Sequence, residues 1–181
     1  MFARHGLEVV DVEELSTHGG SLRLHVAHRS CAPAEAPRVA ELRAREIAAG
    51  LSTPESYSAF AQRVVRRKRE LLHFLIDAAD AGKQVVGYGA PAKGNTLLNY
   101  CGVGPDLLAY TVDRSPHKQG RFLPGSRIPI FAPEKIVETR PDFVLILPWN
   151  LKDEIAAEMS VVSSWGGAFV VPIPEMSVVS I

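Results

Sequence analysis

The sequence predicts an α/β fold: a Rossmann-like parallel sheet with helices on both faces, preceded by a β-hairpin and a helical linker. Two observations in residues 83–181 support this prediction. Short apolar runs alternate with helical stretches there, which is typical of a parallel sheet covered on both sides. The first apolar run is followed by a glycine-rich turn that opens a helix, as in nucleotide-binding βα units.

The composition is that of an ordinary folded protein. Of its 181 residues, 46% are hydrophobic and 22% are charged. Lys+Arg and Asp+Glu number 20 each, so the formal net charge of zero favours neither nucleic acid nor a membrane surface as a partner. Cys31 and Cys101 lie far apart in the sequence, and we expect neither a metal site nor a disulfide scaffold. No membrane span or signal peptide is recognisable, which indicates a cytoplasmic protein.

Residues 1–29 are expected to form two strands, 7–15 and 21–29, joined by the turn Ser-Thr-His-Gly-Gly. In the second strand Leu22, Leu24 and Val26 alternate with Arg23, His25 and Ala27, which is typical of a β-strand. Because two strands alone are marginally stable in water, we expect this pair to be the remnant of a larger sheet.

Residues 30–82 are interpreted as a linker with two helices. A Pro/Ala-rich stretch leads into a helix over 39–49, and a second helix is expected from Pro54 to about Ala81. The basic run at 66–69 is interpreted as a solvated helix face, since an acidic residue follows it and the chain is neutral. One side of the second helix gathers the apolar residues Phe60, Val64, Leu71, Leu72, Leu75 and Ile76.

Residues 83–181 contain the alternating elements of the predicted sheet. We expect strands at 84–89, 107–113, 142–149 and 168–174, and helices from about Lys93, over 132–138 and over 151–165.

The glycine-rich turn is the candidate nucleotide-binding loop. Its glycines permit a tight turn and close approach of backbone N–H groups to a phosphate, and the helix N-terminus adds partial positive charge. The spacing fits neither a strict GxGxxG motif nor a Walker A motif, so the glycines alternatively serve only a tight βα turn. The candidate residues are Gly87, Gly89, Ala90, Lys93, Gly94, Asn95 and Thr96.

Further candidates follow the later strands. Asp113 ends the second strand, where doubly wound folds place a ribose-binding acid; alternatively it only caps or turns the chain. Lys93 is either a phosphate contact or a solvated lysine. Trp149 can stack on a base or form a wall of a cleft, and Asn150 either binds the ligand or, as we favour, caps the next helix. The basic loop 114–130 is either a surface loop or a cover over a diphosphate.

One candidate catalytic residue remains, His18 in the turn between the first two strands. A histidine in a free turn can act as a general base or contact a sugar hydroxyl. Because the sequence fixes no carboxylate beside it, we assign it no firm catalytic role.

Four sequence blocks follow one another through residues 83–175: GYGAPAKGNTLLNYCGVG (87–104), VDRSPHKQGRFLPGSRIPIFAPEKI (112–136), PDFVLILPWNLKDEI (141–155) and WGGAFVVPIPE (165–175). Together they resemble the C-terminal domain of bacterial S-adenosylmethionine-dependent sugar C-methyltransferases. Residues 6–29 resemble the last two strands of the preceding methyltransferase domain of that family. The resemblance implies a nucleotide-sugar substrate, typically a dTDP-sugar, and S-adenosylmethionine as the methyl donor of the full-length enzyme.

The sequence also departs from that family, because it lacks the four-cysteine zinc domain and the S-adenosylmethionine-binding core. We therefore expect a truncated form, a split gene product or a remnant: a substrate-side, nucleotide-sugar-binding portion that is inactive alone and binds no cofactor itself. Two alternatives stay open. The chain is a docking module that joins a methyltransferase domain or self-associates through its strand pair, or it is an NAD(H)-binding Rossmann protein.

Overall fold

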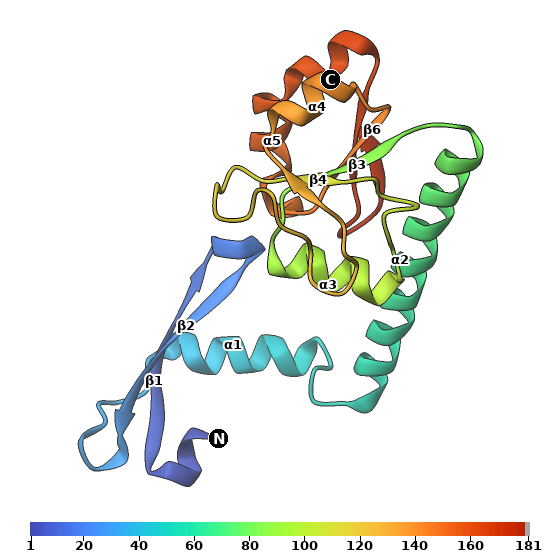
Figure 1. Ribbon diagram of the computed structural model, residues 1–181. Coiled ribbons are helices and arrows are strands. Elements are labelled where there is room, and N and C mark those ends of the chain that lie inside the picture. The colour runs from blue at the N-terminus through green and yellow to red at the C-terminus, as the bar shows by residue number, and fades with distance from the viewer. Residues whose placement is uncertain (180–181) are drawn as a thin grey trace. The chain divides into compact units, whose positions relative to one another are not determined.

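The computed structural model describes residues 1–179 and divides the chain into two compact units, Met1–Gln62 and the remainder from Arg63 on (Figure 1). None of the helices in the described range is long and apolar enough to cross a membrane. The two units are described separately below.

The first unit is a β-hairpin with a helix packed on it. Strands β1 (Leu7–Leu15) and β2 (Ser21–His28) pair antiparallel, which confirms the predicted hairpin. The short 3₁₀ helices η1 (Phe2–His5), η2 (Thr17–Gly19) and η3 (Arg29–Cys31) precede β1, join the strands and follow β2. Helix α1 (Pro37–Ala48) contacts β1, and ion pairs from Arg38 to Asp11 and from Arg45 to Glu14 join the two elements.

The second unit contains the predicted Rossmann-like sheet. Its six strands are ordered β5-β4-β3-β6-β7-β8, and all neighbouring pairs are parallel except β7 with β8. The chain builds outward from β3 through β4 to β5, then returns to the other side of β3 with β6. The strands are β3 (Val85–Tyr88), β4 (Thr111–Val112), β5 (Ile130–Phe131), β6 (Phe143–Ile146), β7 (Ala168–Val171) and β8 (Ser177–Val179).

Helices cover both faces of this sheet (Figure 1). Helix α2 (Pro54–Asp80), from Arg63 on, and α3 (Ala92–Cys101) pack on one face, whose core includes Leu75, Leu98 and Leu145. Helices α4 (Glu134–Thr139) and α5 (Lys152–Glu158) and the 3₁₀ helix η5 (Ser160–Trp165) pack on the other, around Ile146 and Phe169. Neighbouring residues of a strand therefore pack into different cores, one on each face of the sheet. This explains why these strands are apolar throughout.

Several element boundaries differ from the sequence prediction. The predicted strand 107–113 is regular only at Thr111–Val112, because Leu107 and Leu108 belong to a turn that donates to the carbonyl of Gly104. Leu108 is apolar because it is buried in the core, not because it lies in a strand. Strands β5 and β8 were not predicted, and the strand predicted last is followed by β8.

The predicted helix 151–165 is broken into α5 and η5. The Ser163 and Ser164 hydroxyls donate to the carbonyls of Ser160 and Val161, three residues back, and such bonds compete with α-helical geometry. On α2 the predicted apolar side is only partly right. Leu71 and Leu75 are buried, whereas Phe60 and Ile76 are exposed.

We expect Trp165→Phe to lower the free energy of unfolding by about 1 kcal/mol. The substitution keeps most of the apolar contact but removes the hydrogen bond from the indole Nε1 to the carbonyl of Pro141, 3.0 Å away. Urea unfolding measures the change, with the exposed Ser160→Ala as a control expected within about 0.5 kcal/mol of the unchanged protein. A loss no larger than that of the control would contradict a structural role for this bond.

Candidate functional site

The candidate site lies where the order of strand connections reverses, between β3 and β6. Ligands of open α/β sheets bind in the crevice outside the carboxyl ends of the strands at such a point. The turn after β3 and the turn after β6 approach closely here. A Cβ added to Gly89, whose φ is +88°, would lie 2.6 Å from Pro148 Cδ, and one added to Gly94 would lie 2.7 Å from Leu147 Cβ. The structure thus explains why glycine stands at both positions.

A pocket of about 220 Å³ opens at this edge. Prolines and aliphatic side chains form part of its wall, and Arg114 and Lys118 bring charge to it. Its lining consists of Tyr88, Gly89, Pro91, Asp113, Arg114, Lys118, Pro148, Leu151 and Ile155.

Lys93, Trp149 and Asn150 come together across the two turns. The Lys93 ammonium donates to Asn150 Oδ1 and lies 4.5 Å from the centre of the Trp149 ring. Asn150 therefore does not cap α5 as we favoured; the N-cap position is Leu151 and has no side-chain capping bond. Within the described residues Lys93 has no ion pair with a carboxylate, and burial lowers its pKa. Lys93 is therefore a partly buried cation held by a neutral amide and an aromatic ring.

Asp113, the expected ribose-binding acid, reaches the glycine-rich turn instead. Its Oδ2 accepts from the Ala90 N–H at 2.7 Å and from Lys118 Nζ at 3.0 Å, and its Oδ1 accepts from the Ser115 N–H at 2.9 Å. Burial pushes the pKa of Asp113 upward, but the Ser115 N–H, the Lys118 ammonium and the Ala90 N–H outweigh it, so the pKa lies below its ordinary value. The carboxylate is therefore ionised at neutral pH.

A second polar cluster at the pocket was missed by sequence reasoning. The Arg114 guanidinium bridges Glu154 and Glu158 of α5 at 3.4 and 3.1 Å. Tyr88 donates to Glu158 at 3.4 Å, and burial, followed by the Glu158 charge, raises the pKa of Tyr88 to about 12. Tyr88 is therefore a donor and not a base at neutral pH. The available signal was the spacing of two glutamates one helical turn apart after β6.

Three predicted binding residues, Gly87, Asn95 and Thr96, do not line the pocket. Gly87 is buried in β3 against Thr111, where a Cβ would lie 2.6 Å from Thr111 Oγ1. Thr96 donates to the Ala92 carbonyl, and the Asn95 side-chain oxygen accepts from Asn99 within α3.

The basic loop 114–130 is held to the body of the second unit. Leu123 and Ile128 are buried in its core, and Asn99 Nδ2 donates to the Pro124 carbonyl at 2.9 Å. His117, Arg121 and Arg127 of the loop are exposed. Leu123 and Ile128 therefore anchor this loop to the core of the second unit.

His18 lies in the first unit, exposed, in the turn η2. Its backbone has φ +57° and ψ +19°, a left-handed conformation that a residue with a side chain adopts at some cost. Within residues 1–179 no three His, Cys, Asp or Glu side chains gather in a way that could hold a metal ion.

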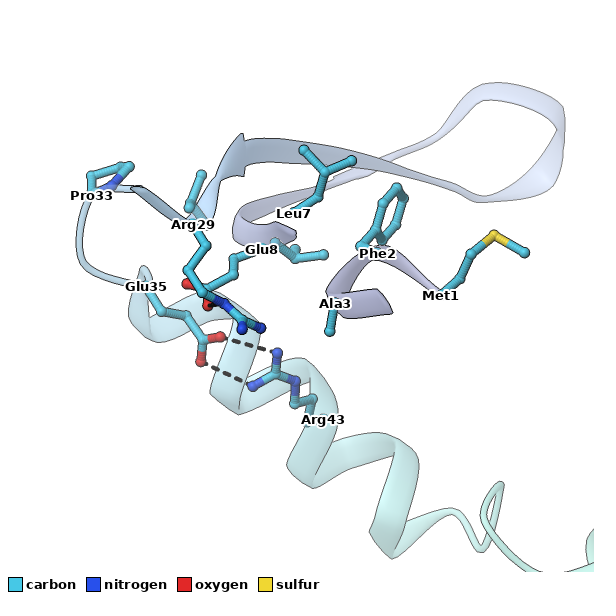
Figure 2. Close-up of a pocket in the computed structure, with 11 residues that line it drawn as sticks. Met1, Phe2, Ala3, Leu7, Glu8, Arg29, Pro33, Glu35 and Arg43 are labelled. Atoms are coloured by element: carbon cyan, nitrogen blue, oxygen red, sulfur yellow. Dashed lines mark hydrogen bonds and ion pairs between the residues drawn. The ribbon is translucent and has the colours of Figure 1, made fainter. Parts of the chain in front are cut away.

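A larger pocket of about 440 Å³ lies within the first unit, between η1, β1 and the segment leading to α1 (Figure 2). Its charged side chains pair with each other, Arg43 with Glu35 and Arg29 with Glu8. The rest of its lining is mostly apolar, and it contains none of the groups expected to bind a nucleotide. We therefore place the candidate site at the sheet edge of the second unit and not here.

Comparison with known proteins identifies the family. Residues 16–174 match the family described as the C-methyltransferase C-terminal domain. The chain belongs to this family. C-methyltransferase NovU from Streptomyces niveus is 40% identical over 180 residues, which cover 99% of this chain and 43% of that protein. This C-methyltransferase C-terminal domain thus spans less than half the length of its curated relative, and the expected resemblance is confirmed.

Among solved structures, UDP-D-quinovosamine 4-dehydrogenase from Vibrio fischeri is similar with a TM-score of 0.42 and 19% sequence identity. The likeness covers 55% of this chain and 94% of that one. The family match extends beyond the sheet unit, since it begins at Ser16, in the turn between β1 and β2.

Proposed function

We propose that this chain is the substrate-side part of a sugar C-methyltransferase and that its sheet-edge crevice binds the nucleotide of a nucleoside-diphosphate sugar, such as a dTDP-sugar. Membership of the C-methyltransferase family supports the reaction class. Methyl transfer to a carbon beside a ketone requires a base and a methyl donor in line with that carbon. In this proposal S-adenosylmethionine is bound by the full-length enzyme outside this chain, whose residues hold and orient the substrate.

The observation that carries the proposal is the Lys93 ammonium. The other two cations at the crevice are already paired, Arg114 with two glutamates and Lys118 with Asp113, whereas Lys93 has only Asn150 and Trp149 as partners within the described residues. It stands in the first turn of α3, where the helix dipole also favours negative charge. A diphosphate would supply the counter-charge that Lys93 lacks.

Trp149 and the pocket walls supply the complementary surface. The Trp149 ring faces Lys93 and can stack on a base or a sugar once a ligand takes the ammonium. Pro91, Pro148 and Leu151 offer apolar contacts in the pocket, whose lining does not itself include Lys93, Trp149 or Asn150. We propose Lys93, Trp149 and Asn150 as direct ligand contacts, with Gly89 and Gly94 permitting the two turns to approach. His18 is proposed only as a contact or base of the complete enzyme.

Thermal unfolding with added ligands tests the proposal. We expect dTDP or UDP to raise the melting temperature, and S-adenosylmethionine and NAD to leave it unchanged. A ligand at 100 times its dissociation constant stabilises by roughly 2.7 kcal/mol. A shift with NAD alone would instead support the dinucleotide alternative, and no shift with any nucleotide would contradict nucleotide binding by this chain.

A docking role is a second candidate, favoured by the surface of the hairpin. Leu22 and Leu24 of β2 are 49% and 44% exposed, and β1 and β2 form a sheet of two strands only within the described residues. Such a hairpin can add to the sheet of a methyltransferase domain or to a second copy. Size-exclusion chromatography with and without dTDP separates the candidates, since docking predicts association that is independent of nucleotide.

A further inference from the structure

We infer that Asp113 and Lys118 are positioning residues that hold the Gly89–Ala90 turn in its binding conformation, and that neither is a ligand contact. The inference rests on the proposed nucleotide-binding function of the crevice. It assigns to Asp113 a different role from that of the ribose-binding acid found at this place in doubly wound folds.

The polar backbone groups of the turn are all in use. The Gly89 N–H donates to the Val112 carbonyl at 2.6 Å, and the Gly89 carbonyl accepts from the buried Thr111 hydroxyl at 2.8 Å. The Ala90 N–H donates to Asp113 Oδ2 at 2.7 Å, and the Ala90 carbonyl accepts from Lys118 Nζ at 3.1 Å. Strand β4 and the residues after it therefore fix the N–H and the carbonyl of two successive residues.

The same bonds exhaust the donors that a phosphate would need from this turn. Gly89 and Ala90 have no N–H left to offer, and Pro91 has none to begin with. A glycine-rich turn that cradles a phosphate needs its N–H groups free. In this chain the turn is instead a rigid support that sets the position of Lys93 and of the start of α3.

The Asp113 carboxylate has little capacity for a ligand. It accepts three hydrogen bonds, from the N–H groups of Ala90 and Ser115 and from Lys118, and its side chain is only 13% exposed. Lys118 in turn bridges Asp113 and the Ala90 carbonyl. A carboxylate has about four acceptor positions, so a ribose diol that donated both hydroxyls to Asp113 would have to displace one of these three donors and leave it unpaired.

Other charged groups stand around the pair. Arg114 follows Asp113 directly but points to Glu154 and Glu158, and Tyr88 contributes a hydroxyl that remains protonated. Because both groups bond to glutamates of α5, neither donates a hydrogen bond to Asp113. The Asp113–Lys118 pair therefore connects the residues after β4 to Ala90, while β4 itself holds Gly89.

Asp113→Asn and Lys118→Met test the assignment, with the exposed α5 residues in Asp153→Asn and Lys152→Met as charge-matched controls. The first readout is amide hydrogen exchange of Ala90 in the ligand-free protein, followed by NMR. We expect exchange at Ala90 to be roughly tenfold faster in both test variants and unchanged in both controls. Unchanged exchange at Ala90 in the test variants would overturn the inference.

The second readout separates positioning from contact. We expect Asp113→Asn to weaken UDP, 2′-deoxy-UDP and 2′,3′-dideoxy-UDP by the same factor, roughly threefold to tenfold, because a displaced turn affects all three ligands alike. A loss that disappears when the 2′- or the 3′-hydroxyl is removed would show that Asp113 binds that hydroxyl and would overturn the inference. If the unchanged protein binds none of these nucleotides, the proposed function fails, while the exchange measurement still decides whether the pair holds the turn.

Discussion

Replacing Gly89 by Ala is expected to lower the free energy of unfolding by roughly 2–5 kcal/mol. Two costs add. A residue with a Cβ at φ +88° is strained by about 1–2 kcal/mol. The new methyl group would also lie 2.6 Å from Pro148 Cδ and 2.9 Å from Pro148 Cγ, and such overpacking costs typically about 1–3 kcal/mol. Chemical denaturation of the full chain measures the loss.

Gly102→Ala is the matched control for this experiment. Gly102 also has a positive φ, +76°, but a Cβ there would meet no atom within 4 Å. The control should therefore show only the backbone cost, about 1–2 kcal/mol. Equal losses in the two variants would show that the turns after β3 and β6 do not approach as closely as the structure indicates.

The second large effect is expected on ligand binding. Lys93→Met should weaken dTDP by roughly 10–100-fold, because hydrogen bonds to charged groups contribute about 1.5–3 kcal/mol. The methionine keeps the length of the side chain and its contact with the Trp149 ring but removes the charge. Isothermal titration calorimetry on the full chain measures the change in affinity.

Lys83→Met is the control for Lys93→Met. The Lys83 ammonium also lies over an aromatic ring, 5.3 Å from the centre of Phe143, but it precedes β3 and so stands at the opposite edge of the sheet. We expect the Lys83→Met variant to bind dTDP with unchanged affinity. If both variants bind dTDP as well as the unchanged protein, Lys93 is not the phosphate contact.

The fold was predictable because its signals are local. Apolar runs bounded by turns gave the positions of β3, β6 and β7, and Pro54 with Gly82 gave the length of α2. The prediction failed where tertiary contacts decide the conformation. Leu108 is apolar but lies in a turn. The predicted helix 151–165 is α-helical only to Glu158, and two serine hydroxyls bond to carbonyls three residues back within the 3₁₀ helix that follows.

The location of the candidate site was predictable from the sequence, but the hydrogen-bond partners of its residues were not. Strand order at the sheet edge brings Gly89, Asp113 and Trp149 to one region, as a doubly wound sheet requires. Which donor meets which acceptor depends on distances of tenths of an ångström that no sequence pattern encodes. The contact of Lys93 with Asn150 and that of Asp113 with the Ala90 N–H are of this kind.

The central claim is that a nucleotide binds beside Trp149, and its fluorescence tests this most directly. The chain has two tryptophans, so Trp165→Phe leaves Trp149 as the only one. Titrating this variant with dTDP should change the Trp149 emission saturably, because the ligand takes the Lys93 ammonium from the ring. An unchanged emission at dTDP concentrations that raise the melting temperature would place the nucleotide elsewhere, and no response in either measurement would contradict the proposed function.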